Sequence, residues 1–241
     1  MMVCSIMLWK AIFVNVQARK HISLADLQLN LTNLSCSLSL PLLTIRKTTT
    51  DKPVTCGSVV KLTHVESGGK HYLSSENKNL GSGSGQQIVT WIPEKEARSA
   101  LWWIRRNNDE EEDCESGTEP IVCGSTVRLT HLTTRRNLHT HTIPSPLSRQ
   151  QEISGFGEDG KGDTGDDWVV ECNTGQWKRN KPVRFKHVDT QRYLGGSANV
   201  KFTQQNCGHS CPILHHLEAF GRKQRDDYSV VKVEMGVLLS K

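Results

Sequence analysis

Apolar and polar residues alternate in three short segments of the chain, and a histidine ends each segment. The segments are residues 59–64, 126–131 and 183–187. In each segment the histidine shares one face with the apolar residues, and the basic residues lie on the other face. An alternation with a period of two is typical of a β-strand with one buried face. The chain is therefore predicted to contain three copies of one β-rich unit, which bury their apolar faces together.

Each copy continues with further short strands at corresponding places. A strand containing leucine follows the histidine in all three copies, at 71–73, 137–139 and 192–194. A run that starts with Gln-Gln comes next at 86–89 and 150–153, with a less distinct counterpart at 214–220. The last strand of each copy is predicted to start at an aromatic residue: Trp102, Trp168 or Tyr228. Four strands per copy and threefold symmetry predict an all-β fold, the β-trefoil, and a two-sheet sandwich is the alternative.

The copies divide the chain into a lead and three repeats, which we number 1 to 3. The repeats are predicted at residues 51–106, 118–172 and 173–235, so that 51–235 together form one trefoil. Residues 1–18 predict a signal peptide, because 1–16 are apolar apart from Lys10 and Asn15 and small residues follow. Residues 19–50 are interpreted as a linker or disordered lead, with an incorrect translation start as the alternative.

Composition narrows the class of protein. Of the 241 residues, 36% are hydrophobic and 23% are charged, which is typical of a soluble globular protein. The formal net charge of +5 comes from interleaved signs rather than basic blocks, so nucleic acid is not favoured as a partner. The apolar stretch 34–45 is too short to span a bilayer, and no membrane span is predicted.

The cysteines follow the repeat boundaries. In repeats 1 and 2, one cysteine precedes the first strand and another follows the last strand. We therefore predict two disulfides that tie the ends of each repeat together in an oxidising compartment: Cys56–Cys114 and Cys123–Cys172. Cys207 and Cys211 are candidates for a third, small bridge. Cys36 is left free or is removed with a longer leader.

Several motifs have both a functional and a structural interpretation. Residues 155–161 match G-x-x-x-x-G-K, but glycine follows and no helix is predicted there, so a loop is favoured over a phosphate site. The aspartates of 159–167 are interpreted as a solvated loop rather than a calcium site. His139 and His141 lack further ligands nearby, so no metal is predicted. The three recurring histidines favour hydrogen bonding within the core. Because no catalytic constellation is present, the chain is predicted to be non-enzymatic and without a cofactor.

Longer segments resemble those of a known family. They are residues 55–62, 81–87, 128–131, 136–141, 145–148 and 162–168. Together they resemble stromal cell-derived factor 2 and its relatives, which consist of three MIR repeats. The resemblance covers about residues 51–235. It is weaker in repeat 3, which lacks the Gln-Gln element and has Cys207 and Cys211 in addition.

The resemblance implies a β-trefoil in the lumen of the endoplasmic reticulum, with a role in protein folding and quality control. The implied partners are a lumenal J-domain co-chaperone, its heat-shock chaperone and unfolded client proteins. Relatives usually end in a retention tetrapeptide, whereas residues 238–241 read Leu-Leu-Ser-Lys, so secretion is the alternative location. The alternative function is a lectin for O-mannosylated clients or other glycans, with Trp91, Trp103 and Trp177 as the candidate stacking residues.

The binding face is predicted beside the loop 140–148, because two prolines stiffen this exposed loop at low entropic cost. The predicted partner- or ligand-binding residues are Arg135, Arg136, His139, His141, Pro144 and Pro146. Asn30 and Asn33 stand in glycosylation sequons, which matter if that segment survives processing in the lumen.

Overall fold

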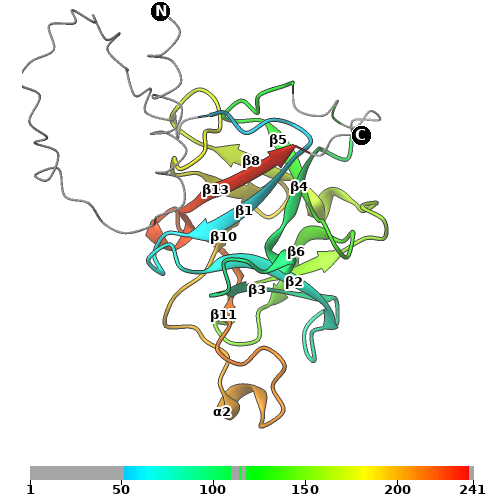
Figure 1. Ribbon diagram of the computed structural model, residues 1–241. Coiled ribbons are helices and arrows are strands. Elements are labelled where there is room, and N and C mark those ends of the chain that lie inside the picture. Colours follow the sequence, from blue (N-terminus) through cyan, green and yellow to red (C-terminus); the bar gives the residue numbers. More distant parts are fainter. Residues whose placement is uncertain (1–51, 110–113, 115–117, 239–241) are drawn as a thin grey trace, which may run out of the picture. The chain divides into compact units, whose positions relative to one another are not determined.

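The fold is built almost entirely from β-strands (Figure 1). A computed structural model describes residues 52–109, 114 and 118–238. The predicted signal peptide and lead, with Cys36 and the sequons at Asn30 and Asn33, lie outside the described residues. Short helical turns accompany the strands: η1 (Arg98–Ala100), η2 (Thr164–Asp166), η3 (Asp227–Ser229) and α2 (Gln204–Cys207).

The strands fall into three groups that follow the repeats. The first group is β1 (Ser58–His64), β2 (Tyr72–Asn79), β3 (Gln87–Ile92) and β4 (Trp102–Arg106). The second group is β5 (Thr126–His131), β6 (Asn137–Pro144), β7 (Gln151–Phe156) and β8 (Trp168–Glu171). The third group is β9 (Arg184–His187), β10 (Tyr193–Gly195), β11 (Leu217–Glu218), β12 (Phe220–Arg222) and β13 (Val231–Leu238). Ala219 interrupts the third strand of the last group, which is therefore divided into β11 and β12.

The first and last strands of the three groups close into a barrel. Antiparallel pairing runs from β1 to β4, β5, β8 and β9 in turn, and β13 pairs with β1. A bridge between Val183, just before β9, and Val231 of β13 completes the ring. A sandwich of two sheets has no such closed ring, so the pairing excludes that alternative.

The second and third strands form three hairpins at one end of the barrel, and the hairpins pair with one another. The hairpins are β2–β3, β6–β7 and β10–β12. The third strands are joined by pairings of β3 with β7, β7 with β12 and β11 with β3. A closed barrel capped by three joined hairpins is the β-trefoil that the sequence predicts. In Figure 1, β2, β3 and β6 lie below the barrel strands β1, β4 and β13.

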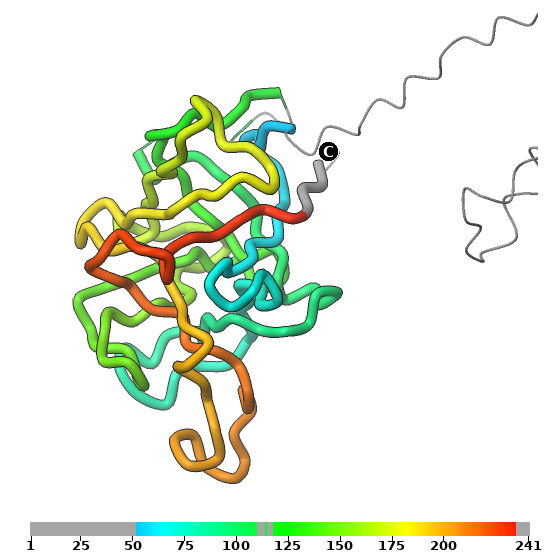
Figure 2. The backbone as a smooth tube through the Cα atoms, turned by 90° about the vertical axis from the view of Figure 1, so that its left-hand side faces the viewer, coloured from blue at the N-terminus to red at the C-terminus, as the bar shows by residue number. Residues whose placement is uncertain are grey.

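One hydrophobic core takes residues from all three repeats. The apolar residues of the three alternating segments are at most 1% exposed: Val60, Leu62, Val127, Leu129, Val183 and Phe185. Repeat 3 differs by a long excursion between β10 and β11. Figure 2 shows the orange segment around α2 extending from the lower end of the fold, and a disulfide joins Cys207 to Cys211 there.

The two larger predicted disulfides are present. Cys56 is bonded to Cys114, and Cys123 is bonded to Cys172. Each bond joins the chain before the first strand of a repeat to the chain after its fourth strand. Closing loops of this length contributes about 4 kcal/mol each in the chain-entropy description.

The predicted start of the last strand in repeat 3 is wrong by three residues. Trp102 and Trp168 pair with the histidines His131 and His187, and the residue that pairs with His64 is Val231, not Tyr228. Tyr228 lies instead in η3, which precedes the strand. An aromatic residue was expected at the strand's first position by analogy, whereas the position is occupied by a smaller aliphatic side chain.

Candidate functional site

The junction between repeats 1 and 2 contains a polar network around one recurring histidine. Nε2 of His131 donates to the carbonyl oxygen of Ser99 at 3.0 Å, and the Thr134 hydroxyl donates to Nδ1 of His131 at 2.8 Å. Nε2 of Gln87 donates to that hydroxyl oxygen at 2.7 Å. A neutral imidazole protonated on Nε2 satisfies all of these bonds. Burial accordingly lowers the pKa of His131 to about 4.

The junction between repeats 2 and 3 has the same network. Nε2 of His187 donates to the Gly165 carbonyl at 3.1 Å, and the Thr190 hydroxyl donates to Nδ1 of His187 at 2.9 Å. Nε2 of Gln151 donates to the Thr190 hydroxyl at 2.8 Å. Burial lowers the pKa of His187 as well. The recurring histidines therefore hold the repeats together, which is the structural role expected from their recurrence.

The junction between repeats 3 and 1 is different. Nε2 of His64 donates to the Tyr228 carbonyl at 2.9 Å, but Nδ1 is buried without a hydrogen-bond partner among the described residues. The ring of Trp91 lies 5.0 Å from the His64 ring, and Trp91 donates to the Gly195 carbonyl at 3.0 Å. The bonds from threonine and glutamine at the other two junctions thus have no counterpart at Nδ1 of His64.

The aromatic residues suggested for sugar stacking are mostly inside the protein. Trp91 and Trp177 are fully buried, so neither can stack on a glycan. Trp103 is half-buried, and the guanidinium groups of Arg105 and Arg135 lie over its ring at 4.9 and 5.3 Å. The interpretation of these tryptophans as exposed lectin residues is therefore wrong for two of the three.

His139 and His141 form a chain that ends at a buried carboxylate. Nδ1 of His139 donates to Oδ1 of Asp166 at 2.7 Å, and both side chains are fully buried. On the other side of the His139 ring, Nε2 accepts from Nε2 of His141 at 2.5 Å. The His139 ring packs closely against Gly165, because a Cβ at that position would lie only 2.3 Å from Cε1 of His139. His141 is partly exposed, and burial lowers its pKa.

The same chain is close to a possible set of metal ligands. Ligand atoms of His139, Asp163 and Asp166 lie within 4.8 Å of one another. However, Asp163 Oδ1 accepts from the Gly165 amide at 2.9 Å, and Asp166 Oδ2 accepts from Nδ2 of Asn137 at 2.8 Å. These oxygens cap η2 and fix it to β6, so the arrangement is explained without an ion. That no metal binds here stays a prediction.

The acidic loop is less solvated than expected. Asp166 is fully buried and Asp167 is 5% exposed. The amide and side chain of Asn108 both donate to Oδ1 of Asp167 at 3.1 Å. Burial nevertheless raises the pKa of Asp167 to about 6, because it penalises the charged carboxylate more than these bonds favour it. The interpretation of residues 159–167 as a wholly solvated loop is therefore wrong at its end.

The predicted binding residues do not gather at one site. Arg135 stacks on Trp103, and Nη1 of Arg136 donates to the Gly157 carbonyl. Pro146 lines an apolar hollow beside the excursion of repeat 3, together with Leu80, Ile88, Phe202 and Ile213. Pro144 lines a different pocket, which contains both charged and apolar side chains. These positions are near one another in the sequence, but the strand β6 separates the two arginines at its start from the prolines at its end, so they lie on different surfaces.

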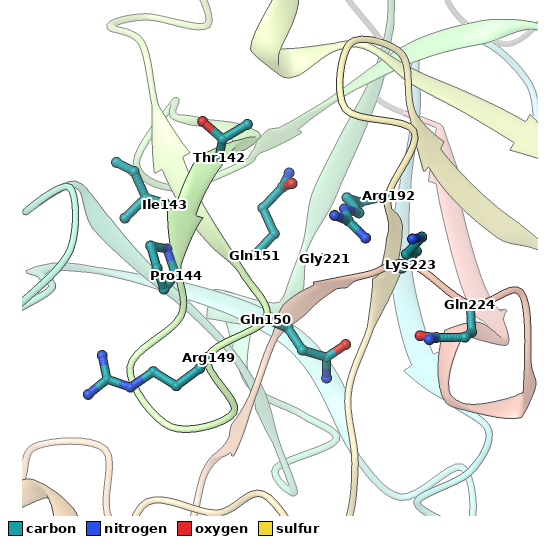
Figure 3. A pocket seen from close by; sticks show the side chains of 10 residues that line it. All are labelled: Thr142, Ile143, Pro144, Arg149, Gln150, Gln151, Arg192, Gly221, Lys223 and Gln224. Atoms are coloured by element: carbon teal, nitrogen blue, oxygen red, sulfur yellow. The ribbon is translucent and has the colours of Figure 1, made fainter.

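The pocket at Pro144 lies between repeats 2 and 3 and has a volume of about 370 Å³. Figure 3 shows Thr142, Ile143 and Pro144 on one side, Arg192 and Lys223 on the other, and Gln151 between them. Arg149, Gln150, Gly221 and Gln224 complete the lining. The cations of this pocket were missed by sequence reasoning because they come from three segments far apart in the chain.

Within the described residues, no helix is long and apolar enough to cross a membrane.

Comparisons with known proteins place these features in a family. The MIR domain profile matches residues 54–171. Mouse stromal cell-derived factor 2-like protein 1 is 41% identical over 77% of this chain and 78% of its own length. Human stromal cell-derived factor 2 is 42% identical over 77% of this chain and 82% of its own length. A crystal structure of the SDF2-like protein from Arabidopsis thaliana is 32% identical, with a TM-score of 0.67, and covers 78% of this chain and 98% of that chain.

Proposed function

Since the chain belongs to the stromal cell-derived factor 2 family, we propose that it acts in protein folding and quality control as a non-enzymatic binding protein. Its place of action is the lumen of the endoplasmic reticulum. Its partners are a lumenal J-domain co-chaperone, the heat-shock chaperone that this co-chaperone serves, and unfolded clients. Secretion is the alternative location.

The observation that carries the binding role is the contrast between the buried and the exposed polar groups of the described residues. The buried His139 and Asp166 bind each other, and the junction histidines bind backbone carbonyls. These groups are occupied in holding the fold together. The pocket between repeats 2 and 3, by contrast, presents charged groups to a ligand.

The disulfides support an oxidising compartment. Three bonds join residues within the described part of the chain: Cys56–Cys114, Cys123–Cys172 and Cys207–Cys211. Disulfides persist in secreted proteins and in the endoplasmic reticulum, and they are rare in the cytosol. The lumen therefore fits the covalent structure of the protein.

Affinity purification of the tagged full chain from lumenal extract, followed by mass spectrometry, tests the proposal. We expect the J-domain co-chaperone and its heat-shock partner to be retained, and an unrelated, folded and disulfide-bonded lumenal protein with the same tag serves as the control. A glycan array tested with the same preparation covers the lectin alternative. Binding to mannosylated glycans without recovery of either chaperone would replace the proposed function with the lectin.

A further inference from the structure

Three cations line the pocket between repeats 2 and 3 without a counter-charge. Arg149, Arg192 and Lys223 contribute to the lining, and no acidic residue does. None of the three side chains has a hydrogen bond or an ion pair to any other described residue. Like charges around one hollow repel one another, and this repulsion is relieved when an anion enters.

Other arginines near this pocket are paired. Arg222 forms an ion pair with Asp226, and Arg225 forms one with Glu171 at 3.0 Å. The protein therefore has carboxylates in this region, but they are directed to cations outside the pocket lining. Arg192 and Lys223 stand together on one side of the hollow, while the side chain of Arg149, which also belongs to the lining, extends away from them (Figure 3).

The corresponding pocket between repeats 1 and 2 shows that the fold does not require these charges. It has a volume of about 200 Å³ and is lined by Gln86, Gln87 and Arg136. Gln87 pairs with Gly155 as Gln151 pairs with Gly221, which makes the two pockets equivalent. Counting along the strands from these pairs, Gly85 stands in place of Arg149, and Gly157 stands in place of Lys223.

The remaining cation of the pocket between repeats 1 and 2 is used within the protein. Arg136 stands in place of Arg192, because its carbonyl accepts from the amide of His131 as that of Arg192 accepts from His187. Its Nη1 donates to the Gly157 carbonyl. One pocket thus has three available cations, while its equivalent has one that is already bonded.

The lining indicates what kind of anion the pocket fits. Arg192 and Lys223 stand opposite Ile143 and Pro144, so a ligand would meet charge on one side and apolar surface on the other (Figure 3). The carboxamides of Gln150 and Gln224 can donate to and accept from peptide groups. A volume of about 370 Å³ is also within the range of pockets that take more than a single inorganic ion.

We propose that this pocket binds an acidic peptide segment, with a carboxylate at Arg192 and Lys223 and an apolar side chain at Ile143 and Pro144. Guanidinium and carboxylate groups match in shape and charge, which strengthens their hydrogen bonds. This inference deepens the proposed binding role and rests on it for the choice of a protein as the ligand.

Fluorescence anisotropy with the full, disulfide-bonded chain tests the inference. The probe is a labelled peptide in which glutamates flank leucines, and its matched control has glutamine at each glutamate. We expect the glutamate peptide to bind more tightly, and Arg192→Gln with Lys223→Gln to weaken its binding by about tenfold or more. The control variant Lys70→Gln with Lys201→Gln removes the same charge from exposed sites outside the pocket and is expected to leave binding unchanged.

Three results would overturn the inference: equal binding of the two peptides, unchanged binding by the pocket variant, or an equal loss in the control variant. Displacement of the peptide by inorganic phosphate at equal concentration would show a site for small anions and also overturn it. Thermal unfolding of both variants checks that each is folded. Peptide binding without recovery of a chaperone from lumenal extract would overturn the proposed chaperone partnership while leaving the pocket's ligand in place.

Discussion

At two junctions of this trefoil, the polar junctions, Nδ1 of the histidine is bonded to a threonine, whereas at the third, the aromatic junction, Nδ1 of His64 has no partner among the described residues and the ring packs on Trp91. At the first two, a glutamine of one repeat reaches a threonine and a histidine of the next, as Gln87 reaches Thr134 and His131. At the third, Leu217 stands in the place of the glutamine and pairs with Trp91. In all three junctions, however, the histidine keeps its bond from Nε2 to a backbone carbonyl. The bond from Nε2 is therefore common to all three junctions, whereas Nδ1 is bonded to a threonine at two junctions and has no partner among the described residues at the third.

The exchange is explained by volume. Trp102 packs against His131 with ring centroids 5.2 Å apart, and Trp168 packs against His187 at 5.1 Å. The equivalent residue beside His64 is the smaller Val231. Trp91 supplies the missing ring from β3. At the third junction, leucine therefore replaces the glutamine at Leu217, and the aromatic ring comes from Trp91 of β3 instead of from the last strand of the preceding repeat. We interpret these two differences as one coupled change.

We expect the largest effect when Trp91 is removed. Trp91→Ala leaves a cavity beside His64 and frees the carbonyl of Gly195, so the free energy of unfolding should fall by about 3–5 kcal/mol. Trp103→Ala is the matched control, because Trp103 is half-buried and stacks on arginines, and it should cost about 1 kcal/mol. Denaturant titration measures both. Equal losses would mean that Trp91 does not hold the third junction.

Acid should act most strongly on the polar junctions. His131 is neutral in the folded protein, with its pKa at about 4, while the unfolded chain takes up a proton at the ordinary value of 6.5. The contribution of His131 to the free energy of unfolding is therefore fully present above pH 6.5. It decreases by about 3 kcal/mol as the pH falls to about 4. At His64, Nδ1 lies 3.9 Å from the carboxylate of Glu66, which favours the protonated imidazole. We therefore expect protonation of His64 to cost less stability than protonation of His131. His131→Gln should flatten the acid slope more than His64→Gln does.

Asp167 acts in the opposite direction over part of this range. Its folded pKa of about 6 lies above the ordinary value of 3.8, so its contribution to stability increases as the pH falls from about 6 toward 3.8. Asp167→Asn should therefore steepen the loss of stability in acid. Unfolding free energies measured across this range, with the single variants side by side, separate the two contributions. A slope unaffected by His131→Gln would contradict the assignment.

The strands and disulfides could be predicted from the sequence because their signals are local. The alternation that places Val60, Leu62 and His64 on one face is visible in seven residues, and each disulfide follows from the position of its cysteines at the ends of a repeat. The burial of Trp91 could not be predicted in this way. It depends on His64, which pairs with Val231, and on the carbonyl of Gly195, and both come close to Trp91 only after the barrel has closed.

The pocket between repeats 2 and 3 could not be predicted from the sequence either, because its lining residues come from separate segments of the chain. Pro144 was predicted as a binding residue from its loop, and it does line the pocket. The charge that defines this pocket comes from Arg149, Arg192 and Lys223, which are brought together by the pairing of β12 with both β7 and β10. Pro146 and Arg136, which were predicted together with Pro144, belong to other surfaces.

The smallest effect should come from the threonines of the polar junctions. Thr134→Val removes the hydroxyl between Gln87 and His131, so it leaves Nε2 of Gln87 and Nδ1 of His131 without this partner. We expect a loss of about 1–3 kcal/mol in the free energy of unfolding. Ser67→Ala is the control at the third junction, where the serine hydroxyl donates to the carbonyl of His64 and not to its ring. Its loss should be smaller than that of Thr134→Val.

A double variant then tests whether the third junction can be reproduced at the first. Gln87→Leu introduces the residue type that Leu217 provides at the third junction. Because it removes the donor that Thr134→Val leaves unpaired, the two changes together should cost less than the sum of the single losses. Additive losses would show that Gln87, Thr134 and His131 are not coupled. In that case the polar junction would be a set of separate contacts, and its difference from the aromatic junction would have no energetic meaning.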